Sequence, residues 1–184
     1  VLLDTGSAPL WIPNASIAQN LTSSHHTFNC SESKTCKSVQ ENVYNISYGM
    51  GSILGTEIID DVQIGAITVP QYHFLLASDI KYIPNLYYDG IMGLSLGRWS
   101  YLDHFPTLLE SLKMSGAIST GMFSMYLGND PDAIGNMTGE LIFGGYDPKY
   151  ADSEFQFVHL ESGNKTLLWT TNMTALGFGG KNVS

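Results

Sequence analysis

The first seven residues are the most informative about the fold: Val1-Leu2-Leu3-Asp4-Thr5-Gly6-Ser7. Three apolar residues in a row predict a short buried strand, and the Asp-Thr-Gly that follows predicts a tight turn at its end. Thr5 and Ser7 supply hydroxyls close to Asp4 in the sequence, and no lysine or arginine is nearby. A carboxylate placed there needs hydrogen bonds, because an unpaired buried charge is costly, and its neighbours can tune its pKa.

Further along the chain, other short elements follow this motif in a fixed order. They are Leu10-Trp11-Ile12-Pro13, Tyr48-Gly49-Met50-Gly51-Ser52, Tyr88-Asp89-Gly90-Ile91-Met92-Gly93-Leu94 and Ile142-Phe143-Gly144-Gly145. In this order they resemble the pepsin-like aspartic proteases, and the resemblance runs nearly end to end. It implies a mainly β fold: a pepsin-like acid-protease β-barrel lobe with one clear short helix. It also implies an endopeptidase that hydrolyses peptide bonds in proteins at acidic pH.

The hydrophobic pattern gives the same class of fold. Residues 42–48 alternate apolar and polar side chains, and residues 53–64 return after a glycine-rich turn, which predicts a hairpin with its tip near residues 49–51. A helix is predicted between Pro106 and Gly116, with leucines on one face. Further strands are predicted at residues 68–76, 90–94, 123–127 and 139–143, and an exposed loop region at residues 15–37.

The pattern changes after Tyr146, where Asp147-Pro148 begins a fresh set of short strands. We therefore expect residues 1–146 to form an N-terminal lobe that lacks its first strands. Residues 147–184 are expected to form the connection between lobes and the first strands of a C-terminal lobe. A length of 184 residues fits one large domain or two small ones.

Composition limits the partners. The chain is 43% hydrophobic and 14% charged, which is enough apolar content for a core, and its net charge is −9. This charge disfavours nucleic acid and acidic membranes as partners. It suits an acidic compartment, although an ordinary acidic soluble protein would look the same. No apolar run is long enough to span a bilayer, and a membrane anchor is not visible in these residues.

Asn-X-Ser/Thr triplets, the acceptor sequence for N-glycosylation, are unusually frequent. We expect Asn29, beside Cys30, and Asn45, in a predicted strand, to stay unmodified. Cys30 and Cys36 are the only cysteines, and an oxidising compartment favours a disulfide between them over two free thiols. These features predict the secretory pathway, with an extracellular or vacuolar/lysosomal destination. The candidate glycosylation sites are Asn14, Asn20, Asn136, Asn164 and Asn172, and Asn182 begins one more triplet.

The resemblance assigns the chemistry to Asp4. In the family, two aspartates share one proton and activate a water, one accepting a proton while the other donates to the carbonyl. Ser7 would hydrogen-bond the carboxylate of Asp4, and Thr5 would lock the turn to its counterpart in the other lobe. Gly6 belongs to the same catalytic support. The plain alternative is a turn aspartate at a strand end with no catalytic role. We expect no cofactor and no metal site. The histidines show no catalytic spacing, so we expect them on the surface or beside helix ends.

The resemblance also assigns a substrate cleft. The hairpin tip at Tyr48, Gly49 and Met50 matches the flap that closes over a bound peptide, with the hydroxyl of Tyr48 directed toward Trp11. The family usually carries a small hydroxylated residue in place of Met50. Met50 would lose one side-chain hydrogen bond to substrate, so the resemblance implies the flap but not the family's subsite preference. An apolar pocket wall is assigned to Leu2, Tyr82, Ile83, Tyr88 and Ile91. Each of these aromatic and aliphatic residues would also fit an ordinary core.

One part of the family pattern is missing from these residues: a second Asp-Thr/Ser-Gly. We therefore interpret the chain as a fragment with half of a catalytic pair, which we expect to be inactive alone and monomeric as the full-length protein. The rival hypothesis is a catalytically dead pepsin-like glycoprotein that binds peptides or a partner. Intact Asp4, Trp11 and Tyr48 favour the protease.

Overall fold

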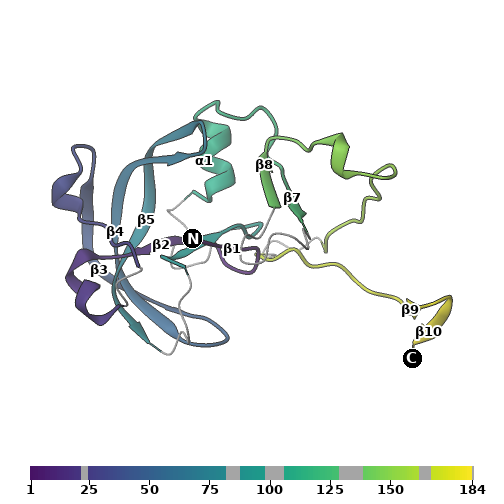
Figure 1. Ribbon diagram of the computed structural model, residues 1–184, viewed down its shortest axis with the longest axis horizontal. Coiled ribbons are helices and arrows are strands. Elements are labelled where there is room, and N and C mark those ends of the chain that lie inside the picture. The colour runs from purple at the N-terminus through teal and green to yellow at the C-terminus, as the bar shows by residue number, and fades with distance from the viewer. Residues whose placement is uncertain (22–24, 82–87, 98–105, 129–138, 162–166, 184) are drawn as a thin grey trace.

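The main body of the protein is a β-sheet of six strands (Figure 1). The computed structural model describes residues 1–21, 25–81, 88–97, 106–128, 139–161 and 167–183. Within them the fold is mainly β with one α-helix, as predicted. Across the sheet the strands are β1 (Leu2–Asp4), β6 (Ile91–Gly93), β2 (Leu10–Pro13), β5 (Ile67–Lys81), β4 (Ser52–Ile64) and β3 (Lys37–Ser47).

Strands β3, β4 and β5 form an antiparallel meander that makes up most of the sheet. The predicted hairpin is confirmed: β3 and β4 pair from Ser47 opposite Ser52, and the N–H of Tyr48 donates to the carbonyl of Gly51 at 2.9 Å to close the tip. We call β3, β4 and this tip the flap hairpin. Alternating side chains of the meander enter two buried apolar clusters, one on each side of the strands.

The short helix α1 (Leu108–Met114) packs against β5 and closes the larger of these clusters with Leu108 and Leu112 (Figure 1). Thr107 begins it with a capping box, in which its hydroxyl accepts from the N–H of Glu110 and its own N–H donates to the Glu110 carboxylate. Gly116, at φ +74°, follows its end. The predicted helix is thus confirmed, with Thr107 as its cap.

The segment between β2 and β3 contains two 3₁₀ helices, η1 (Ala15–Asn20) and η2 (Cys30–Glu32), where the sequence predicted only loop. The Cys30–Cys36 disulfide is confirmed. The loop that it closes is anchored on the meander, because Ser33 Oγ and Thr35 Oγ1 both donate to the buried carboxylate of Asp60.

The C-terminal part of the chain is far more exposed to solvent than the six-stranded sheet. A hairpin of β7 (Phe123–Leu127) and β8 (Gly139–Phe143) lies beside the sheet, and η4 (Pro148–Tyr150) follows it. Trp169 returns to the body, where its Nε1 donates to the carbonyl of Leu94 at 2.8 Å. The chain then runs outward to the hairpin β9 (Leu176–Phe178) and β10 (Lys181–Val183) (Figure 1). In the described ranges, no helix has the length and hydrophobicity needed to cross a membrane.

One prediction about the opening strand is wrong. β1 forms at the predicted place, but Leu2 and Leu3 are 43% and 40% exposed instead of buried. The reason is its position: among the strands that the structure describes, β1 is the outermost one of the sheet and pairs only with β6, so no described strand lies along its other edge. A run of apolar residues predicted the strand but not its place at the edge.

Candidate active site

The catalytic candidate Asp4 ends β1 and faces a turn made by the next residues. The N–H of Gly6 donates to Asp4 Oδ1 at 2.9 Å, so the turn itself holds the carboxylate. Asp4 is partly buried, whereas Thr5 and Gly6 are exposed. The sequence thus predicted the turn and the need for a hydrogen bond to this carboxylate.

Strand β6, which contains the motif residues Ile91–Gly93, holds the turn at Asp4 in place. β1 and β6 run parallel, with Asp4 opposite Gly93. Leu94 N–H donates to the carbonyl of Asp4 at 2.7 Å, and Ser95 N–H donates to that of Ser7 at 3.0 Å. A Cβ on Gly93 would lie 2.3 Å from the carbonyl carbon of Ala8, so only glycine fits at this crossing. Residues distant in sequence therefore fix the position of Asp4.

The predicted contact between the flap and the core is present. Trp11 is fully buried in β2, and its Nε1 donates to Tyr48 Oη at 2.8 Å. β2 pairs with both β6 and β5, which holds the indole at the centre of the sheet. Gly49 and Met50 beyond Tyr48 are exposed, Met50 by 68%. The flap tip is thus anchored at Tyr48 and open to solvent at Met50.

The predicted pocket wall is brought together in part. Tyr88 and Ile91 pack in the same apolar cluster as Trp11 and Tyr48. Leu2 lies opposite Ile91 in the register of β1 and β6, but its side chain is exposed and is not part of that cluster. Tyr82 and Ile83 lie outside the described residues.

These elements are those of a known enzyme family, and comparison with known proteins gives the same result. A family model described as "Eukaryotic aspartyl protease" matches residues 1–184, the whole chain. The chain belongs to the eukaryotic aspartyl proteases.

Curated relatives of this aspartyl protease chain cover most of it. Human gastricsin is 35% identical over 149 residues, which is 80% of the chain and 37% of gastricsin. Cathepsin D of Clupea harengus is 31% identical over 185 aligned residues, 97% of the chain and 44% of the relative. Pregnancy-associated glycoprotein 2 of Bos taurus is 30% identical, covering 98% of the chain and 46% of the relative. The chain therefore spans less than half the length of these relatives.

One predicted contact in the aspartyl protease site is not formed. The hydroxyl of Ser7 was expected to bond the carboxylate of Asp4, but Ser7 is 1% exposed and its Oγ has no hydrogen-bond partner within the described part of the chain. The hydrogen bond from Ser95 fixes the Ser7 backbone in the interior, while Gly6 contacts the carboxylate instead. The motif predicted which residues gather at the turn, but not which of them bonds the carboxylate.

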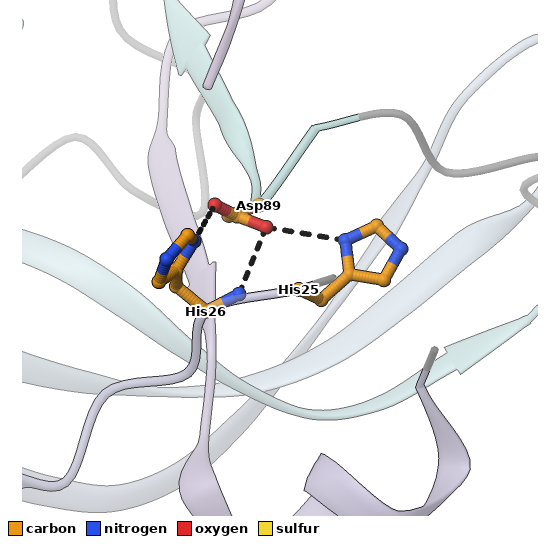
Figure 2. A network of polar contacts seen from close by, with 3 residues as sticks. All are labelled: His25, His26 and Asp89. Carbon is orange, nitrogen blue, oxygen red and sulfur yellow. Dashed lines mark hydrogen bonds and ion pairs between the residues drawn. The ribbon is translucent and has the colours of Figure 1, made fainter. Parts of the chain in front are cut away.

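A network beside the pocket wall was missed by the sequence analysis. Asp89, next to Tyr88, lies between two imidazoles (Figure 2). Its Oδ1 is 3.1 Å from His25 Nδ1 and accepts from the N–H of His26 at 3.0 Å, and its Oδ2 is 2.9 Å from His26 Nδ1. Partial burial raises the pKa of Asp89, but the hydrogen bonds from His26 and His25 outweigh this and hold the pKa below its ordinary value.

The expectation of surface histidines is therefore wrong for some of them. His25 has only 7% of its side chain exposed. His73 is 25% exposed and lies 2.6 Å from the fully buried carboxylate of Glu57. His26 and His159 are exposed as expected, and His104 is outside the described residues. The sequence did not indicate that His25 and His26 contact Asp89, because Asp89 lies far from them along the chain. The side chains in the described ranges form no cluster able to hold a metal ion.

Proposed function

We propose that the full-length protein is an aspartic endopeptidase that hydrolyses peptide bonds in proteins at acidic pH, with Asp4 as one of two catalytic aspartates. The observation that carries this proposal is the fixed turn at Asp4. Its carboxylate accepts from Gly6, and its backbone is held by β6 and Leu94. The second aspartate would come from residues outside this chain, since the sequence contains a single Asp-Thr/Ser-Gly motif.

The chemistry requires a paired carboxylate. Two carboxylates close together cannot both ionise, so they hold one proton between them and titrate as a unit; aspartic proteases are the standard example. The ionised member accepts a proton from the attacking water, and the protonated member donates to the peptide carbonyl. With one such carboxylate, residues 1–184 alone are expected to show no peptide hydrolysis.

The flap would supply substrate binding. An extended peptide can add to the exposed backbone of the hairpin tip as another strand. Anchoring of Tyr48 on the indole of Trp11 fixes the base of the tip, and Tyr88 and Ile91 offer apolar surface for large hydrophobic side chains at the cleaved bond. The proposed partner is thus a peptide or protein substrate, bound by a monomer.

The secretory pathway is the proposed route of the protein. The Cys30–Cys36 disulfide requires oxidising conditions, and the frequent N-glycosylation triplets point the same way. An extracellular or vacuolar/lysosomal destination also suits the excess of acidic residues.

Asp4→Asn in the purified full-length protein tests the function. We expect a loss of about a thousandfold or more in kcat/KM for an unfolded protein substrate at acidic pH, with an unchanged melting temperature. Asp152→Asn, an exposed residue away from the turn, is the matched control and should keep full activity. If the wild type binds peptides at acidic pH but cleaves none, the dead-enzyme hypothesis takes the place of this proposal.

A further inference from the structure

The glycosylation triplets differ in how the fold presents them. Asn29 is half-buried, and both ends of its side-chain amide are hydrogen-bonded: its Oδ1 accepts from both the N–H and the hydroxyl of Ser31, and its Nδ2 donates to Glu32 at 2.8 Å. Asn14 caps η1 through its Oδ1, which accepts from Ser16 N–H. Asn136 and Asn164 lie outside the described residues.

Asn45 is presented differently, although it lies in a strand. Ile46 is completely buried, while Asn45 and Ser47 on either side of it are exposed. Since side chains alternate along a strand, Asn45 and Ser47 project from the same outer face of β3, opposite the cluster that contains Trp11. Both residues that define the acceptor triplet are thus accessible on the back of the flap hairpin. The strand position of Asn45 led us to expect an unmodified residue, but this position does not bury the side chain.

Asn45 lies on an edge of the sheet, beside an exposed apolar side chain that a glycan would cover. Within the described part of the chain, β3 is the edge strand of the six-stranded sheet, and edge strands are where sheets pair with other chains. Two residues before Asn45 on the same face, Val43 is 60% exposed. An exposed apolar residue on an open edge favours pairing between copies, and natural sheets protect such edges with charge, proline or cover.

We propose that Asn45 carries an N-linked glycan, which covers Val43 and keeps the outer edge of the flap hairpin from pairing with another copy of the chain. The glycan lies on the face of β3 away from Tyr48 and Trp11, so it leaves the substrate side of the flap open. The inference depends on the secretory route proposed above and not on protease activity.

Peptide mapping by mass spectrometry tests the modification. The full-length protein is secreted from eukaryotic cells and treated with an N-glycosidase, which converts each modified asparagine to aspartate. We expect conversion at Asn45 in most molecules, its loss in Ser47→Ala, and its return in Ser47→Thr, which restores the triplet. An unmodified Asn45 beside modified Asn20 or Asn172 would overturn the proposal. An entirely unmodified protein would overturn it together with the secretory route, and neither result bears on catalysis by Asp4.

Light scattering tests the role of the glycan. Ser47→Ala should shift from monomer toward dimer or larger species at a concentration where the wild type is monomeric. Thr174→Ala, which removes the triplet at the exposed Asn172, is the matched control and should stay monomeric. Equal association of wild type and Ser47→Ala, with Asn45 shown to be modified, would remove edge protection from the proposal.

Discussion

Trp11 and Tyr48 meet inside an apolar cluster of the sheet, whereas Asp4, Thr5 and Gly6 lie in a turn that is largely open. The flap side of the site is held by burial and by a side-chain hydrogen bond within the cluster. The Asp4 side is held almost entirely by backbone hydrogen bonds from Gly6, Leu94 and Ser95. The flap side of the site is therefore part of the core, whereas the turn at Asp4 is attached to the core mainly through backbone groups.

Gly93→Ala should cause the largest loss of stability, because it disrupts the attachment of the Asp4 turn to the core. Its Cβ would meet the backbone of Ala8 at 2.3 Å, and backbone cannot yield as a flexible side chain can. We expect a loss of about 3 kcal/mol in the free energy of unfolding, measured by urea denaturation of the full-length protein. Gly145→Ala, where an added Cβ meets nothing within 4 Å, is the control. Equal stabilities of the two variants would contradict a rigid crossing.

Tyr48→Phe should weaken the attachment of the flap hairpin to the core, with a smaller loss of stability than Gly93→Ala. It leaves Trp11 Nε1 buried without its acceptor, which costs about 1–2 kcal/mol. A double-mutant cycle with Trp11→Phe isolates the bond: the double variant should be more stable than the sum of the single losses predicts. Strict additivity of the two losses would show that the hydrogen bond contributes nothing.

Asp89→Asn should have the smallest effect, and one that depends on pH. The hydrogen bonds from His26 and His25 lower the pKa of Asp89 despite its partial burial, so the folded state binds its proton less readily than the unfolded state does. The resulting stabilisation is present above the ordinary aspartate pKa of about 4 and is lost as the pH falls through the lowered value. Melting temperatures from acidic to neutral pH should therefore fall more steeply on the acid side for the wild type than for Asp89→Asn. Parallel curves would contradict this.

The sequence predicted those features of the structure that depend on residues close together in the chain. The flap hairpin, α1 and the turn at Asp4 were predicted because their patterns are local: alternation, a capped apolar face, and Asp-Thr-Gly. The bond between Trp11 and Tyr48 was also predicted, through the family resemblance. The exposure of Leu2, the orphan hydroxyl of Ser7 and the two imidazoles on Asp89 were not. Each depends on which distant segment lies alongside, and no local pattern encodes that.

The parallel pairing of Leu2–Asp4 with Ile91–Gly93 also sets the order in which the molecule can assemble. The meander β3–β4–β5 joins neighbours in the chain, so it can form early, at low cost in loop closure. The turn at Asp4 must wait until the residues that follow β5 have emerged from the ribosome. A nascent chain would thus complete its flap hairpin before the turn at Asp4 is held in position by β6.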